Sequence, residues 1–350
     1  MLLLKDHTAD ELHARLANLG VTARLARRLQ AAVFQRRAAQ IPEQMPEVPR
    51  RVLQAVRQAT TLPRLTLLNK AVSPRDGFAK YLFRGDGPEP FEAVRIPLLH
   101  RPADQKYVVC VSSQVGCALG CAFCATARLG FKRNLAAWEI VDQVVHVQND
   151  SPHPIRGVVF MGMGEPLLNY DRVMKAAQIL SEPVGMAIAA KAITISTVGV
   201  VPMIRRFTAE RRPYRLVVSL TSADSERRRE LLPIEASHPL SELFQALREY
   251  HDVSGRRVTL AWTLLAGINT RREDARRLAA LTTGLPVIID LIDVNDPTGR
   301  FQPPGAEELN AFRDALTEEL GMPVIRRYSG GQDIDGGCGM LAGKVIGTSR

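Results

Sequence analysis

The sequence lacks several features that define large classes of proteins. No apolar run reaches the roughly 18 residues needed to span a bilayer, so no membrane protein is predicted. Residues 1–6 lack a basic stretch that leads into a long apolar core, and no secretory signal is therefore expected. Internal repeats and low-complexity segments are also missing. We therefore expect a soluble enzyme located in the cytoplasm.

Cysteine is scarce, with five residues in a chain of 350. An odd number without a secretory signal argues against a disulfide framework and for a reducing compartment. Three of the five, Cys117, Cys121 and Cys124, stand in the spacing C-x3-C-x2-C. Thiolates with this spacing can hold three irons of a [4Fe–4S] cluster and leave the fourth iron open. A zinc site with four ligands and simple apolar burial are the alternatives.

The open iron of such a cluster has a characteristic use. It can chelate the amino and carboxylate groups of S-adenosylmethionine (SAM), and an electron from the cluster can then split the sulfonium to a 5′-deoxyadenosyl radical. The cysteine spacing is similar to that of the radical SAM superfamily. It predicts two cofactors, a [4Fe–4S] cluster and SAM.

The net charge of the chain also indicates what kind of partner it binds. The formal net charge is +10, which suits a polyanionic partner such as RNA. Residues 1–60 hold ten Lys or Arg against five Asp or Glu. A solvated helix face is the alternative explanation for these basic residues.

Three segments are predicted along the chain. Residues 1–75 form a helical RNA-docking domain, with a first helix that begins at the capping box Thr8–Glu11 and ends near Gly20. Further helices are expected up to residue 37 and over residues 48–59. Residues 76–106 are expected to form a hairpin of strands 78–83 and 92–98, followed by a linker at residues 100–106. Residues 107–350 form the main domain.

In the main domain, apolar strands alternate with amphipathic helices. Six strands are expected at residues 107–112, 157–162, 192–196, 215–220, 258–264 and 287–292. Six helices are expected near residues 136–148, 170–180, 201–209, 240–252, 271–281 and 306–320. This order predicts an α/β fold, a partial (β/α)6 barrel with its site at the carboxyl ends of the strands. The run GMGEP at residues 162–166 follows the second strand, and there Glu165 can accept from an ammonium group.

Five stretches together resemble the RlmN/Cfr family of radical SAM rRNA adenine methyltransferases over nearly the whole chain. They are residues 110–117, the cluster loop, and residues 162–166, 195–199 and 333–339. The resemblance implies that Cys338 accepts a methyl group from one SAM, and that a radical from a second SAM activates this group for addition to adenine. Glu92 would then take the proton from the RNA-bound carbon, and Cys110 would release the product through a transient disulfide with Cys338.

The resemblance also implies which residues contact SAM. They are Gly164, Glu165, Ser196, Ser219, Leu220, Thr221 and Asn295. The chain departs from the family at Thr221, where histidine is usual, in residues 293–297, and in a longer segment between Glu92 and Cys110. These differences indicate a divergent member.

Several alternatives stay open at this stage. The expected substrate is an adenosine of 23S rRNA, methylated at C2 or C8, and tRNA or a small molecule is the alternative acceptor. A non-catalytic iron–sulfur RNA-binding sensor is a third possibility. A monomer that receives electrons from flavodoxin or ferredoxin is expected.

Overall fold

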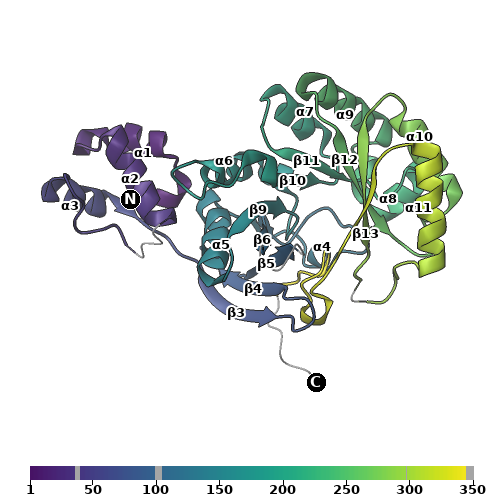
Figure 1. The fold of residues 1–350 in the computed structure, drawn as a ribbon, viewed down its shortest axis with the longest axis horizontal. Coiled ribbons are helices and arrows are strands. Elements are labelled where there is room, and N and C mark those ends of the chain that lie inside the picture. The colour runs from purple at the N-terminus through teal and green to yellow at the C-terminus, as the bar shows by residue number, and fades with distance from the viewer. Residues whose placement is uncertain (36–39, 99–104, 297, 344–350) are drawn as a thin grey trace.

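The computed structural model describes residues 1–35, 40–98, 105–296 and 298–343. Its largest sheet has ten strands, and a small helical lobe lies beside it at the N-terminal end (Figure 1). The strand order is β14-β13-β12-β11-β10-β9-β6-β5-β4-β3.

The parallel part of this sheet contains the six predicted strands, and it confirms the predicted fold class. They are β6 (Lys106–Cys110), β9 (Ile155–Phe160), β10 (Ile193–Thr197), β11 (Arg215–Ser219), β12 (Val258–Leu264) and β13 (Val287–Asp293). Each pairs in parallel with its neighbour. Their apolar runs follow from burial on both faces. A seventh parallel strand, β14 (Val324–Arg327), pairs with β13 and was not predicted.

Helices follow these strands and pack on the outer face of the sheet (Figure 1). They are α5 (Ala137–Asp150), α6 (Tyr170–Ser181), α7 (Val201–Ala209), α9 (Leu240–Ser254), α10 (Arg272–Thr282) and α11 (Ala306–Leu320). All six agree with the prediction within a few residues, whereas α8 (Ser225–Leu231) was not predicted. In the described ranges, no helix combines the length and the apolar character that crossing a bilayer would require.

Three antiparallel strands extend the sheet beyond β6. Strands β4 (Ala79–Arg84) and β5 (Phe91–Leu98) form the predicted hairpin, and β3 (Thr66–Val72) was not predicted. Strand β5 also pairs antiparallel with β6. The hairpin is therefore continuous with the barrel sheet rather than a separate connector. Most of the predicted linker, residues 100–104, lies outside the described residues.

The N-terminal lobe consists of α1 (Ala9–Leu16), α2 (Ala23–Phe34) and α3 (Arg50–Ala59). The capping box is present, with Glu11 N–H donating to the Thr8 hydroxyl over 3.3 Å. Residues 36 and 37 of the predicted second helix lie outside the described residues. A buried ion pair between Lys5 and Asp142 of α5 attaches the lobe to the barrel.

Candidate active site

A cavity of about 470 Å³ opens at the carboxyl ends of the parallel strands. All five cysteines of the chain line it, namely Cys110, Cys117, Cys121, Cys124 and Cys338. None of them forms a disulfide. Residues separated by more than two hundred positions in the sequence therefore share one chemical environment.

The loop with Cys117, Cys121 and Cys124 runs between β7 (Gln114–Val115) and α4 (Ala125–Arg128). Strand β7 pairs with β8 (Arg133–Asn134), which fixes the start of the loop. Gly116 has φ 71°, and a Cβ atom there would overlap the carbonyl oxygen of Gly130. Only glycine permits this turn into the cysteine loop.

The three loop cysteines face the same cavity. Among the described residues, no three His, Cys, Asp or Glu side chains lie close enough together to hold one ion. In a [4Fe–4S] cluster each thiolate would bind its own iron. Burial raises the pKa of Cys117 to about 11, and it raises that of Cys121 further, with help from the charges of Cys124 and Cys117. Bound iron would offset this cost by stabilising the thiolates.

Glu165 lies at the cavity beside the cysteine loop. Its carboxylate accepts from the backbone N–H groups of Leu167 and Val198, each over 3.0 Å. Burial nevertheless raises the pKa of Glu165 to about 7. The preceding Gly164 has φ 97°, and a Cβ there would lie 2.5 Å from the Gln114 side chain. A cationic ligand group would restore the charge of this carboxylate.

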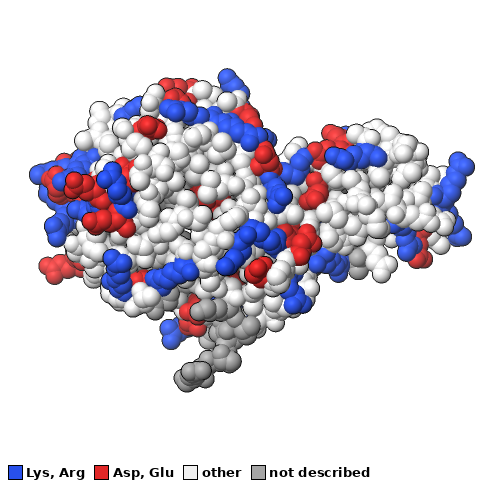
Figure 2. Space-filling view, turned by 180° about the vertical axis from the view of Figure 1, so that it is seen from behind, with Lys and Arg blue, Asp and Glu red and all other residues white. Residues whose placement is uncertain are grey.

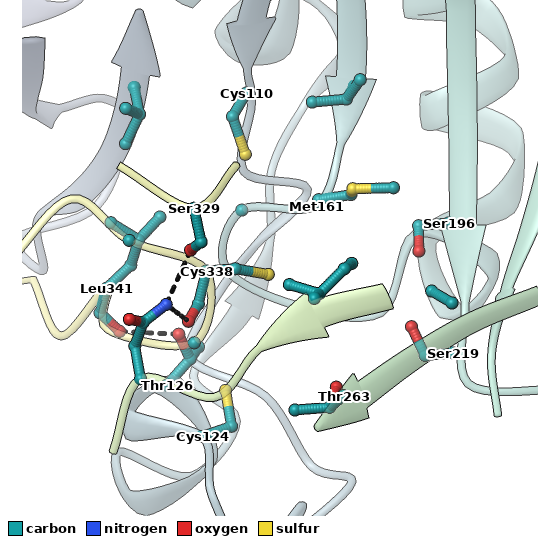
Figure 3. Close-up of a pocket in the computed structure, with 18 of the residues that line it drawn as sticks. Cys110, Cys124, Thr126, Met161, Ser196, Ser219, Thr263, Ser329, Cys338 and Leu341 are labelled. Carbon is teal, nitrogen blue, oxygen red and sulfur yellow. Dashed lines mark hydrogen bonds between the residues drawn. The ribbon is translucent and has the colours of Figure 1, made fainter. Parts of the chain in front are cut away.

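Cys110 and Cys338 both line the cavity, although one lies near the start and the other near the end of the barrel domain in the sequence. Cys110 ends β6, Cys338 lies beyond the short helix η7 (Gln332–Ile334), and both side chains point into the cavity (Figure 3). Burial raises the pKa of Cys110 to about 12, and the charge of Cys338 adds to this effect. Surrounding protein atoms also raise the pKa of Cys338, although this residue is exposed through the open cavity.

The segment that carries Cys338 is bound to the start of α4. The Ala125 N–H donates to Gly339 O over 2.7 Å, and the Thr126 hydroxyl donates to Leu341 O over 2.6 Å (Figure 3). The Asn295 amide donates to the carbonyl of Cys338 over 3.3 Å. Asn295 lines the cavity, yet these contacts make it a support for the Cys338 segment. The cluster loop and Cys338 are thus held as one unit.

Glu92 does not line the cavity. It is fully buried on β5, where it forms an ion pair with Lys80 over 3.0 Å. Its second oxygen accepts from the N–H groups of Ala342 and Gly343 over 2.8 and 2.9 Å. Val94 on the same face of β5 does line the cavity. The carboxylate that was expected to face the substrate therefore binds the backbone of the C-terminal segment instead.

The other expected SAM contacts divide into two groups. Ser196 and Ser219 line the cavity, as Gly164 and Glu165 do. Leu220 and Thr221 are fully buried and do not line it. Thr221 has φ 60°, and its carbonyl accepts from the Asn269 amide over 2.7 Å. The chain enters the core after Ser219, so neither Leu220 nor Thr221 lines the cavity.

Arg327 is a charged cavity residue that the sequence analysis did not predict. Arg327 ends β14, lines the cavity, and forms an ion pair with Asp290 over 3.2 Å. Its charge acts to lower the pKa of both Cys110 and Cys338, against the effect of burial. The apolar pair Val324-Ile325 after α11 was the signal for a further strand, and it would have placed Arg327 at a strand end.

Comparison with known proteins agrees with this geometry. Residues 111–279 match the family model described as the Radical SAM superfamily. A solved radical SAM methyltransferase from Sphaerobacter thermophilus is similar over 98% of this chain and 100% of that chain, with a TM-score of 0.88 and 36% identity. Fold and cysteine site together define a radical SAM enzyme.

Relatives narrow the class further. A "Probable RNA methyltransferase" of Myxococcus xanthus (strain DK1622) is 49% identical over 98% of this chain and 95% of that protein. The "Dual-specificity RNA methyltransferase RlmN" of Syntrophobacter fumaroxidans is 40% identical over 97% of each. The chain belongs to the RlmN/Cfr family of radical SAM RNA methyltransferases.

Proposed function

We propose that the chain methylates a carbon of an adenosine in RNA, C2 or C8 of a residue in 23S rRNA, through S-methylcysteine at Cys338. The convergence of Cys110 and Cys338 on the cavity of the three loop cysteines carries this proposal. The names of the relatives support RNA as the substrate. The name "dual-specificity RNA methyltransferase" also supports a second RNA, for which tRNA is the candidate.

Cofactor binding follows from the lining of the cavity. Cys117, Cys121 and Cys124 would hold a [4Fe–4S] cluster, and Glu165 would accept from the ammonium group of SAM. Ser196 and Ser219 would bind polar atoms of the same ligand. When bound, these cofactors supply a radical strong enough to remove a hydrogen atom from a methyl group.

Cys338 has the chemistry of the methyl carrier. Its thiolate can attack the methyl carbon of SAM, so that a new sulfur–carbon bond forms as the sulfonium–methyl bond breaks and S-adenosylhomocysteine leaves. Exposure through the cavity gives SAM access to the sulfur, and Arg327 favours the thiolate electrostatically. An aromatic C–H of adenine is too poor a nucleophile for this displacement, which explains why radical chemistry is needed.

We also propose roles for Glu92 and Cys110. Glu92 would accept the proton from the RNA-bound carbon. For this, its carboxylate must release the hydrogen bonds from the N–H groups of Ala342 and Gly343 and contact the substrate instead. Movement of this short segment would bring Glu92 into contact with the cavity. Cys110 would attack the sulfur of Cys338 and release the product.

Mass spectrometry tests the proposed function. The intact protein from a methylating host should carry one extra methyl group on Cys338, and rRNA from a deletion strain should lack one methyladenosine. Complementation with the wild-type gene should restore this nucleoside, and Cys338→Ala should not. An unmethylated Cys338, together with full complementation by Cys338→Ala, would contradict the proposed route.

RNA docking by the N-terminal lobe leads to a further prediction. Four arginines of α2 and α3 have no ion-pair partner among the described residues, namely Arg27, Arg28, Arg50 and Arg51. Basic side chains lie at the outer end of this lobe (Figure 2). Their joint replacement by glutamine should reduce the slope of log affinity against log salt by about 2 to 4, because each phosphate contact contributes about 0.7 to 0.9.

Filter binding over a salt series measures this slope. The matched control replaces Arg205, Arg272, Arg276 and Arg277, which form ion pairs on the barrel surface. It should leave the slope unchanged. Equal slopes for the wild type and the α2/α3 variant would assign these arginines to a solvated face.

A further inference from the structure

Helix α8 and the short helix η6 (Pro233–Ala236) lie against the cysteine loop. The Ala122 N–H donates to Leu231 O over 3.0 Å. Leu231 and Leu232 belong to a small apolar cluster, against which Cys121 and Phe123 pack. The loop therefore has a second support, in addition to the Cys338 segment's contacts with α4.

Arg228 of α8 is fully buried within this support. Its guanidinium donates to Glu235 Oε2 over 2.5 Å, to Val198 O over 2.6 Å and to Leu220 O over 3.3 Å. Val198 follows β10 and Leu220 follows β11. One side chain thus joins the ends of two neighbouring strands, next to the cavity residues Ser196 and Ser219.

Arg228 lies near the cysteine loop, because its helix contacts the loop through Leu231 and the Cys121 thiolate is one of the charges that act on it. Burial lowers the pKa of Arg228, while Glu235 and the Cys121 thiolate act in the opposite direction. An arginine remains charged in proteins even so. At low effective dielectric, a charge within reach of a cluster ligand acts strongly on the ligand and on whatever it binds.

We propose that Arg228 is a positioning residue that holds the two SAM-facing strand ends in place and raises the reduction potential of the cluster on the cysteine loop. The inference rests on the proposed function, because it needs both the cluster and SAM. Reduction adds an electron, and a nearby positive charge stabilises the reduced form. The planar fork of arginine reaches both carbonyls and Glu235 at once, which the single ammonium of lysine cannot do.

Two variants separate the two roles. Arg228→Lys keeps the charge and loses the fork, so the cluster potential should stay near that of the wild type while KM for SAM rises. The rise should be about tenfold or more, as expected when a buried charged hydrogen bond is lost. Arg228→Met loses both, so KM should rise and the potential should become more negative.

Glu235→Gln gives a test in the opposite direction. It keeps one oxygen that can accept from Arg228, gives up the bond that the other oxygen accepts from the Leu240 N–H over 3.0 Å, and removes the negative charge. The cluster potential should therefore become more positive. This variant still tests the inference if the Arg228 variants fail to fold. Arg229→Met is the matched control, because Arg229 is exposed on the same helix and should change neither quantity.

Potentiometric titration of the reconstituted protein, followed by electron paramagnetic resonance, measures the cluster potential, and SAM cleavage gives KM and kcat. Unchanged potentials in Arg228→Met and Glu235→Gln, with wild-type KM, would overturn the inference while the proposed function stands. Absence of a cluster signal in the wild type would instead contradict the proposed function itself.

Discussion

Replacement of Cys121 by alanine is expected to abolish cluster binding and SAM cleavage together. Cys121 is one of three thiols on a single loop that faces the cavity, and each would hold one iron. Loss of one ligand leaves two irons without protein thiolates, so the cluster should not survive reconstitution. Iron content, the visible absorbance of the cluster and the yield of 5′-deoxyadenosine measure the loss, which should fall below detection.

Cys110→Ala is the matched control for this experiment. Cys110 lines the same cavity but lies on β6, outside the cysteine loop. Its replacement should leave iron content and SAM cleavage intact. Full iron content and unchanged SAM cleavage in Cys121→Ala would contradict the assignment of the cluster to this loop.

The same Cys110→Ala variant is expected to stall as a covalent protein–RNA adduct. After radical addition, the adduct would lose its unpaired electron to the cluster that the loop cysteines would hold and its ring proton to Glu92, and a methylene would then join the sulfur of Cys338 to the adenine carbon. The Cys110 thiolate then attacks this sulfur, so that a sulfur–sulfur bond forms while the sulfur–carbon bond breaks and its electrons leave with carbon. That carbon takes up a proton and becomes the new methyl group. Without Cys110 the bond to RNA has no partner for exchange.

Denaturing gel electrophoresis with labelled RNA should reveal the adduct. With Cys110→Ala, nearly all of the RNA that has reacted should run as a retarded protein–RNA band. The double variant Cys110→Ala/Cys338→Ala should give no such band. Burial holds the pKa of Cys110 at about 12, so release by the wild type should accelerate as pH rises. Normal turnover by Cys110→Ala would remove the two-cysteine mechanism and leave a radical SAM methyltransferase of another kind.

Local patterns in the sequence predict most of the barrel. The six central strands are long and apolar, and amphipathic helices with clear ends separate them, so each element carries its own signal. Strand β14 was missed because Arg326 and Arg327 follow only two apolar residues. Helix α8 was missed because Arg227, Arg228 and Arg229 resemble an exposed polar stretch, although Arg228 is fully buried.

The site was predictable only in part, for a different reason. Short motifs identify the cysteine loop and Glu165, because their residues are neighbours in the sequence. The position of Glu92 depends on its hydrogen bonds with Ala342 and Gly343, and no local pattern encodes a contact across 250 residues. Thr221 is fully buried and has a positive φ of 60°, which its neighbours in the sequence do not reveal.

The bond between Thr126 and Leu341 has a consequence for biosynthesis, because these residues are 215 positions apart. At roughly 5–20 residues per second, a ribosome completes the cysteine loop roughly 10 to 40 s before it completes the Cys338 segment. During this interval the loop thiols have emerged, while the segment that later binds α4 is still unmade. The order of translation therefore leaves a time window in which iron and sulfide can reach the loop without competition from the thiol of Cys338.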